Sequence, residues 1–209
     1  GRGHRIAPHE INHRANVWAL KSLGVHRLLS VSAVGSLQER YRPLDMVLPS
    51  QFFDRTKKSA EHTFFGKGIV AHVPFADPVC PRLSALATEA ARGAGATVHP
   101  AGCYVAIEGP QFSTRAESRM YRAWGADVIG MTAMPEAKLA REAELPYALV
   151  GMVTDYDCWR EDEAGVDVAQ VIAQLGANAE TARAMLTRLL RGLPEVRPPS
   201  PIDTCLDTA

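Results

Sequence analysis

The sequence predicts an α/β protein: a single domain with a central, mixed, twisted sheet flanked by helices. Apolar segments of strand type alternate along the chain with amphipathic segments of helical type, which is the pattern of a sheet covered on both faces. The length of 209 residues suits one such domain. Hydrophobic residues make up 46% and charged residues 22% of the chain, which is ordinary for a globular protein with a sizeable core.

In the first half of the chain, helix and strand signals follow one another in order. Gly24 closes the first helical pattern, Pro49 ends a short strand, and Pro81 stands at the first position of a helix. The elements expected here are helices over residues 9–23 and 81–93 and strands over residues 27–34 and 46–49.

The second half continues the alternation with longer elements. We expect strands over residues 97–107, 127–132 and 146–154, and helices over residues 114–124, 134–143 and 166–190. The last helix is amphipathic, so one of its faces is expected to point inward. The side chains on that face are Val168, Val171, Ile172, Leu175, Ala179, Met185 and Leu189.

Charge and cysteine usage argue against several classes of protein. Lys and Arg together number 23, as do Asp and Glu, whereas a nucleic-acid binder usually has a basic excess. The same balance disfavours a membrane partner, and we find no apolar run of about 18 residues. The 4 cysteines are scattered without a CxxC spacing, which favours reduced thiols in a cytoplasmic protein over a zinc or other metal site.

Small and hydroxyl-bearing residues stand at the ends of two of the predicted strands. In open α/β sheets, ligands bind at the carboxyl ends of strands. Ser32 and Ala33 stand where small side chains let backbone N–H groups approach an anion, although a plain strand-to-turn transition is the alternative. Thr132 stands at the start of a helix, which suggests anion binding, with a simple capping role as the alternative.

A third segment, residues 107–117, combines an acidic residue, a Gly-Pro pair, an aromatic residue and hydroxyls. If Phe112 is exposed, its ring can stack on a flat ligand; core packing is the alternative. Ser113 or Thr114 can cap the next helix with Glu117 as its capping-box partner, which is the purely structural explanation of these polar residues.

The most informative strand end carries Asp155 and Asp157. In extended geometry both carboxylates point to the same face, and each then raises the affinity of the other for a proton. One of them is then able to act as a general acid near neutral pH. A solvated turn with two incidental acids is the alternative. Metal binding by the pair also stays open, although no His or third carboxylate is nearby in sequence.

Together these segments resemble the purine-nucleoside phosphorylase family, especially its 5'-methylthioadenosine branch. The resemblance extends over about residues 1–190, in the order of the family's motifs. The segments that carry it are Gly1-x-x-His4-x-x-x-Pro8, residues 12–18, Ser32-Ala33-x-Gly35-Ser36-Leu37, residues 108–118 and 124–129, Met131-Thr132-x-x-Pro135-Glu136, and residues 154–159.

The resemblance implies a nucleoside phosphorylase-like fold and a role for each matching residue. His72 is implied to reach the substrate of a neighbouring subunit, although residue types alone make it a lone surface histidine. The implied contacts are Ser32, Ala33 and Thr132 with phosphate, Met131 with the ribose, Phe112, Ser113, Asp155 and Asp157 with the purine, and Val168, Val171 and Ile172 with an apolar 5' substituent.

The implied activity is phosphorolysis of 5'-methylthioadenosine by a homotrimer, with Asp155 protonating purine N7. Inorganic phosphate is the co-substrate, and no metal or organic cofactor is expected. The alternatives are a 6-oxopurine nucleoside phosphorylase and an inactive purine-binding fragment. An amide at position 157 would suit a 6-oxo group, so Asp157 favours 6-aminopurines.

The chain departs from the family at its ends. We expect residues 1–190 to be the phosphorylase-like domain without its first βα unit, and residues 191–209 to be a Pro-rich linker and tail. Both ends are interpreted as truncated. Since the family's Gly-rich phosphate loop belongs to that first unit, we expect the 209-residue chain to bind phosphate poorly on its own.

Overall fold

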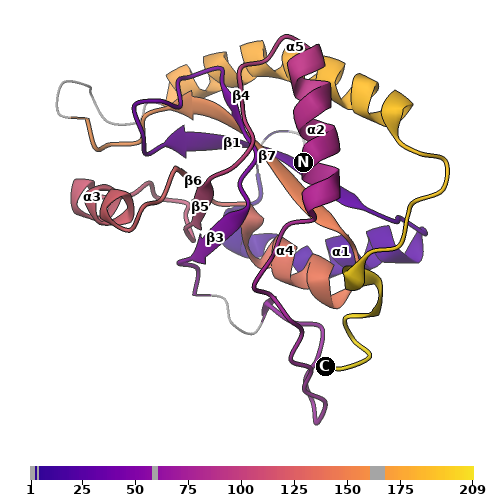
Figure 1. Ribbon diagram of the computed structural model, residues 1–209. Coiled ribbons are helices and arrows are strands. Elements are labelled where there is room, and N and C mark those ends of the chain that lie inside the picture. The colour runs from indigo at the N-terminus through magenta and orange to yellow at the C-terminus, as the bar shows by residue number, and fades with distance from the viewer. Residues whose placement is uncertain (1–2, 4, 58–60, 161–167) are drawn as a thin grey trace.

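The computed structural model describes residue 3 and residues 5–57, 61–160 and 168–209. In this part of the chain the strands form one 7-stranded sheet with the order β3-β5-β6-β1-β7-β2-β4 (Figure 1). The strands are β1 (Leu28–Ser36), β2 (Met46–Val47), β3 (Gln51–Asp54), β4 (Val98–His99), β5 (Cys103–Ala106), β6 (Val128–Gly130) and β7 (Tyr147–Asp155). The helices are α1 (His13–Ser22), α2 (Pro81–Gly93), α3 (Arg115–Ala123), α4 (Ala133–Glu142) and α5 (Val168–Gly192), with short 3-10 helices η1 (Pro8–Glu10) and η3 (Pro201–Thr204).

The sheet is mixed and covered on both faces, as the sequence predicts. β1 and β7 run parallel, whereas β6 is antiparallel to β1 and β2 is antiparallel to β7. Helices α1 and α4 lie on one face, and α2 and α5 lie on the other (Figure 1). Along β7, Leu149 and Val153 pack in the α1/α4 core, while Val150 and Met152 pack in the α2/α5 core. Because β7 is buried on both faces, its sequence is a nearly continuous run of apolar residues.

β1 is paired unevenly on its two sides. It pairs with β7 from Leu28 to Gly35, but with β6 only at Gly35 and Ser36. Within the described residues, most of β1 therefore has a ladder on one side only. Its carboxyl end is the point where β1, β6 and β7 come together.

Two strand predictions need correction. β3 was not expected, because Phe52 and Phe53 form only a two-residue apolar core between Gln51 and Asp54; parallel pairing with β5 makes it a strand. The single strand expected over residues 97–107 is two, β4 and β5. Pro100, which has no N–H to donate, and Gly102, at φ 154°, separate them.

The expectation for α5 is right for its carboxyl-terminal half and wrong for its first turns. Met185 and Leu189 are buried, but Val168 is 58% exposed, Ile172 64% and Leu175 38%. A helix of 25 residues is about 37 Å long, whereas the 9-residue strand β7 on which it packs spans about 30 Å. The helix therefore extends past the sheet at its amino-terminal end.

The carboxyl-terminal segment packs back onto the domain. Ile202 is buried in a small cluster with Val79, Cys80 and Leu83 at the start of α2. The Pro-rich stretch before it thus connects two segments that share a core. No helix among the described residues is long and apolar enough to cross a bilayer.

Candidate active site

The register between β1 and β7 slips by one residue at their carboxyl ends. Val34 pairs with Val153, but Gly35 pairs with Asp155, so Thr154 is the extra residue of a bulge. Such bulges at strand ends re-aim side chains. A Cβ on Gly35 would lie 3.0 Å from Asp155 Oδ1, tighter than ordinary contacts. The glycine therefore allows the Asp155 carboxyl to lie against β1.

The two carboxyls of the predicted acid pair lie together, but through a turn rather than an extended strand. Asp155 Oδ2 accepts a hydrogen bond from Thr154 Oγ1 at 2.7 Å, and Asp155 Oδ1 accepts one from the Asp157 backbone N–H, also at 2.7 Å. Asp157 has a left-handed backbone with φ 53°. Short polar side chains such as Asp tolerate this conformation.

The two carboxyls have different environments. Burial, and after it the negative charge of Asp155, raises the pKa of Asp157, although neighbouring donors such as the Cys158 backbone N–H oppose this. The carboxyl of Asp155 already accepts hydrogen bonds from two donors. The structure thus raises the pKa of Asp157, whereas the sequence argument gives the transferable proton to Asp155. Coupled carboxyls titrate as a pair, so the proton belongs to both.

The Phe112 segment has one exposed aromatic side chain and one buried hydroxyl that the fold does not use. Phe112 is 47% exposed, so it is not a core residue in this chain. Thr114 caps α3, and its capping box with Glu117 confirms the structural explanation for those two residues. Ser113 is different, because its Oγ is buried and has no hydrogen-bond partner among the described residues.

A set of contacts joins the Phe112 segment to the loop that follows β7. Arg115 Nη1 donates to the backbone oxygens of Cys158 at 3.0 Å and Arg160 at 2.9 Å. Cys158 Sγ donates to the backbone oxygen of Ser113 at 3.1 Å. The two segments that carry the predicted purine contacts are thus held to each other.

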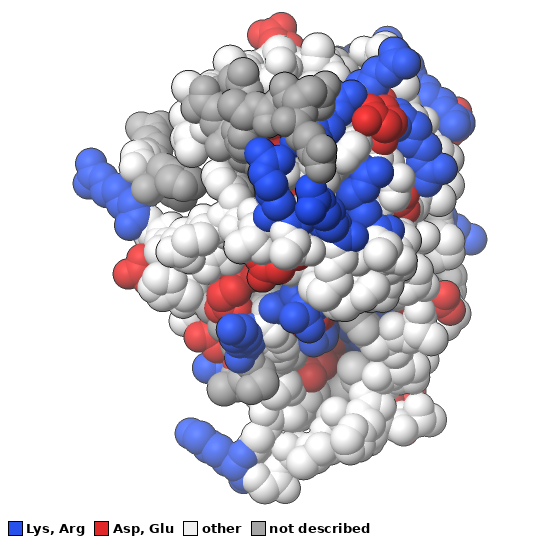
Figure 2. Space-filling view, turned by 90° about the vertical axis from the view of Figure 1, so that its left-hand side faces the viewer, with Lys and Arg blue, Asp and Glu red and all other residues white. Residues whose placement is uncertain are grey.

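The same loop is also held by its aromatic residue. The guanidinium of Arg122 on α3 lies 3.5 Å from the ring centre of Trp159, and Trp159 Nε1 donates to the backbone oxygen of Ser36 at 2.8 Å. Arg160 forms an ion pair with Glu39 at 2.6 Å. Figure 2 faces this side of the molecule and shows basic and acidic side chains interspersed on it.

We call the contacts of Arg115, Arg122, Cys158 and Trp159 the loop clamp. Sequence reasoning missed it, although Arg115 and Trp159 stand inside the quoted motifs. A signal was present in the spacing of Arg115 and Arg122, which are 7 residues apart and therefore lie on one face of a helix.

Of the residues predicted to bind phosphate, Ser32 and Ala33 lie in the middle of β1 rather than at its end, and Thr132 lies two residues beyond β6. Ser32 is buried, Ala33 is half-buried and Thr132 is exposed. Thr132 occupies the N-cap position of α4, but its side chain makes no capping hydrogen bond. The capping alternative does not account for this hydroxyl, which instead lies 3.4 Å from the buried Tyr104 hydroxyl.

Met131, predicted to lie under the ribose, packs against Gly109. Gly109 has φ 67°, and a Cβ there would overlap Met131 Sδ. The thioether can thus lie flat against the backbone of the segment that leads to Phe112. Met131 therefore connects the phosphate side of the candidate site to its purine side.

The remaining predicted contacts are not assembled within one chain. His72 is exposed on the segment between β3 and α2. This segment lies at the bottom of Figure 1, whereas β7 ends at the upper left. Val168 and Ile172 are exposed at the start of α5, on the same side as the end of β7 (Figure 1), and Val171 is half-buried. The amino-terminal motif cannot be placed, because Gly1 and His4 lie outside the described residues.

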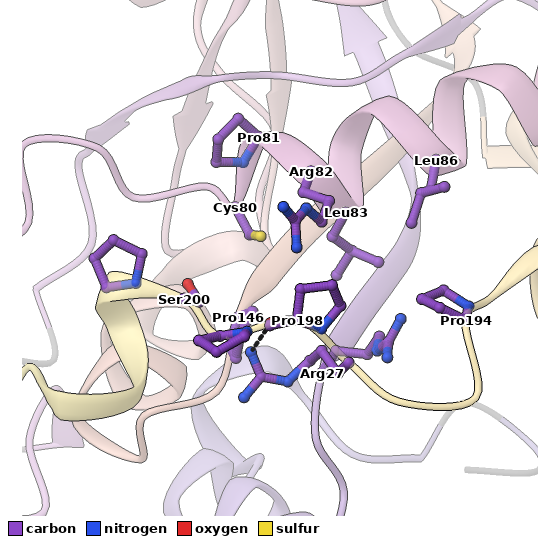
Figure 3. A pocket seen from close by; sticks show the side chains of 13 residues that line it. Arg27, Cys80, Pro81, Arg82, Leu83, Leu86, Pro146, Pro194, Pro198 and Ser200 are labelled. Carbon is purple, nitrogen blue, oxygen red and sulfur yellow. Dashed lines mark hydrogen bonds between the residues drawn. The ribbon is translucent and has the colours of Figure 1, made fainter.

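A hollow elsewhere on the molecule does not belong to this site. A cavity of about 200 Å³ lies between the Pro-rich segment and the start of α2 (Figure 3), and none of the predicted site residues lines it. Its walls include Arg27, Cys80, Leu83, Pro146 and Pro198. Among the described residues, no group of three or more His, Cys, Asp or Glu side chains is arranged to hold a metal ion.

Known proteins match this chain over most of its length. The model of the phosphorylase superfamily matches residues 2–191. S-methyl-5'-thioadenosine phosphorylase of Koribacter versatilis is 55% identical over 94% of this chain and 67% of its own length. The protein of that name from Hyperthermus butylicus is 54% identical over 93% of this chain and 70% of its own length.

Solved structures agree with this assignment. A methylthioadenosine phosphorylase from an antarctic soil metagenomic library superposes with a TM-score of 0.93 at 49% identity, covering 100% of this chain and 74% of the other. Methylthioadenosine phosphorylase from Schistosoma mansoni, in complex with adenine, has a TM-score of 0.88 at 40% identity, covering 93% and 76%. The chain spans roughly two thirds to three quarters of the length of these relatives, and it belongs to the phosphorylase superfamily.

Proposed function

We propose that this protein cleaves S-methyl-5'-thioadenosine with phosphate, giving adenine and 5-methylthioribose 1-phosphate. The observation that carries the proposal is the acid pair Asp155–Asp157 at the end of β7, beside an exposed Phe112 and a Ser113 hydroxyl that has no partner in the described part of the chain. Relatives that are 52–56% identical to this chain over the aligned residues bear the name of this activity. The pathway served is salvage of purine and methionine.

In this reaction phosphate attacks C1' of the sugar, the bond from C1' to the purine breaks, and the sugar passes through a cation-like state. The departing purine gains electron density and takes a proton at N7 from the pair, with Asp155 as the contacting acid. Asp157 accepts from the exocyclic amine of a 6-aminopurine. The phosphate charge stabilises the cationic sugar.

The phosphate is proposed to be held by the hydroxyls of Ser32 and Thr132 and by the backbone at Ala33. The Thr132 hydroxyl is exposed and not used as a cap, so it is able to donate to an anion. Met131 packs beneath the ribose. No metal or organic cofactor has a step in this scheme, and inorganic phosphate is the co-substrate.

We further propose that the protein acts as a cytoplasmic homotrimer in which His72 completes the site of a neighbour. His72 is exposed on a segment well away from the end of β7 in the same chain (Figure 1). Ile69 and Val70, close to it in sequence, are 64% and 74% exposed. Exposed apolar side chains beside a polar residue suit a subunit interface better than open solvent.

A comparison of nucleosides tests the proposed function. Phosphorolysis of S-methyl-5'-thioadenosine, adenosine and inosine is measured with and without inorganic phosphate. We expect the methylthio substrate to react fastest and only with phosphate. Faster turnover of inosine would support the 6-oxopurine alternative, and adenine binding without turnover of any nucleoside would support the inactive module.

A further inference from the structure

A buried tyrosine stands behind both hydroxyls of the proposed phosphate site. Tyr104 on β5 is fully buried, and its hydroxyl lies 3.4 Å from Thr132 Oγ1 and accepts a hydrogen bond from the Thr132 backbone N–H at 3.3 Å. Burial raises the pKa of Tyr104, and Ser32 is close enough for its side chain to oppose this rise, while its Oγ donates to the backbone oxygen of Ala33 at 3.4 Å. One phenol therefore contacts Thr132, just beyond the end of β6, and lies near Ser32 in the middle of β1.

The sheet has a space for this hydroxyl. Tyr104 pairs with Val128, and Ala106 pairs with Gly130, so Gly130 is the diagonal neighbour of Tyr104 on the same face. A Cβ on Gly130 would overlap the Tyr104 hydroxyl. The absence of a side chain at position 130 lets the phenol cross β6 and reach the gap between β6 and β1.

The two residues near the phenol hydroxyl come from opposite sides of that gap. Ser36 pairs with Val128 and Gly35 with Ile129 in antiparallel fashion. β6 ends at Gly130, and Thr132, two residues further on, already has a helical backbone at the N-cap of α4. The Tyr104 hydroxyl therefore stands where the ladder has opened but both hydroxyl side chains are still close to it.

The direction of the hydrogen bonds determines what the site can donate. A phenol has one donor and two acceptor positions, and here one acceptor position takes the Thr132 N–H. Burial raises the pKa of Tyr104, so its proton stays in place at neutral pH. If that proton is donated to Thr132 Oγ1, the hydroxyl proton of Thr132 is left to point outward, toward an anion.

We propose that Tyr104 is a positioning residue for the phosphate, holding the Thr132 hydroxyl in donating orientation beside Ser32 through the space left by Gly130. This role rests on the proposed function. Tyr104 touches neither phosphate nor nucleoside and acts only through Thr132, which does. Its effect must therefore appear in phosphate binding and spare nucleoside binding.

The test is steady-state kinetics of Tyr104→Phe with each substrate varied in turn. We expect the KM for phosphate to rise about 10-fold, as for the loss of one hydrogen bond to a charged group, while the KM for the nucleoside changes less than about twofold. Gly130→Ala, which displaces the same hydroxyl, is expected to act in the same direction.

Phe52→Leu is the matched structural control. Phe52 packs edge-on against the Tyr104 ring with centroids 5.8 Å apart, so its loss loosens the same part of the core and leaves the hydroxyl in place. It should lower the melting temperature without changing the KM for phosphate. If Tyr104→Phe affects both KM values equally, or only the melting temperature as Phe52→Leu does, the positioning role is wrong.

Thr132→Val separates this inference from the proposed function. A rise in the KM for phosphate in Thr132→Val, with no rise in Tyr104→Phe, overturns only the role of Tyr104. An unchanged KM for phosphate in Thr132→Val shows that the phosphate site itself is misplaced, and both proposals then fail at that step.

Discussion

The two sides of the candidate site are built in different ways. On the phosphate side, Ser32 lies within β1 and Thr132 just beyond β6, both near the buried Tyr104, so the core itself sets their positions. On the purine side, Phe112 and Asp157 belong to loops, and the loop clamp holds those loops together. Substitutions on the phosphate side should therefore change both the stability of the fold and the KM for phosphate. Substitutions on the purine side should change the KM for the nucleoside and leave the stability largely unchanged.

The largest effect is expected for Asp155→Asn. An amide still donates a hydrogen bond to N7 but has no proton to transfer, so kcat should fall about 10²- to 10⁴-fold with a small change in KM. Steady-state kinetics with the methylthio substrate measures this, with Asp157→Asn as the matched variant. If only KM changes, Asp155 does not transfer the proton. A larger kcat loss in Asp157→Asn would give that step to Asp157, whose pKa is raised.

The next effect concerns the loop clamp. Arg115→Ala removes both hydrogen bonds to the loop after β7, so the KM for the nucleoside should rise about 10-fold while the KM for phosphate stays unchanged. Arg115→Lys keeps the charge but has a single nitrogen. Its KM for the nucleoside should therefore lie between that of the unchanged protein and that of Arg115→Ala. Equal changes in both KM values would show that the two sides of the site are not mechanically separate.

A smaller effect is expected for Asp157→Asn on base selection. The amide can rotate its oxygen toward an exocyclic amine, so binding of 6-aminopurines should weaken by only about 1–2 kcal/mol. The same amide can turn its NH₂ toward a 6-oxo group. The ratio of kcat/KM for inosine to that for adenosine should therefore rise. An unchanged ratio would mean that Asp157 does not contact the base edge.

The smallest effect is a change in the pH dependence of stability. Because the pKa of Asp157 is raised in the folded state, its contribution to stability is complete below about pH 4, the ordinary range of an Asp, and is lost as pH rises through the raised value. Asp157→Asn should remove this decline. Urea unfolding at a series of pH values measures it, and Asp207→Asn, which changes an exposed carboxyl, should leave the decline intact.

Local sequence patterns predicted the parts of the fold that depend on local sequence. Helix α2 was predicted with its observed bounds, because Pro81 starts it and the apolar spacing continues to Gly93. Strand β7 was predicted because it is buried on both faces. Strand β3 was not, since its identity depends on pairing with β5, which is far away in sequence.

The site shows the same limit. The residues at strand ends could be named from their chemistry, but the turn that joins Asp155 to Asp157 and the support from Tyr104 depend on backbone geometry and register. The inward face expected for α5 was wrong at Val168 and Ile172, because helical periodicity does not tell where the sheet beneath a helix ends.

The one-sided pairing of β1 has a consequence for the exchange of its amide hydrogens with solvent deuterium. In a parallel ladder, alternate residues direct their N–H groups to the same neighbour. From residue 28 to residue 34, β1 is paired with β7 but not, among the described residues, with β6. Protection along this strand should therefore alternate residue by residue, slow toward β7 and fast toward β6. A strand added in that gap would give the second set of N–H groups a partner. The alternation would then disappear even if no side chain moved.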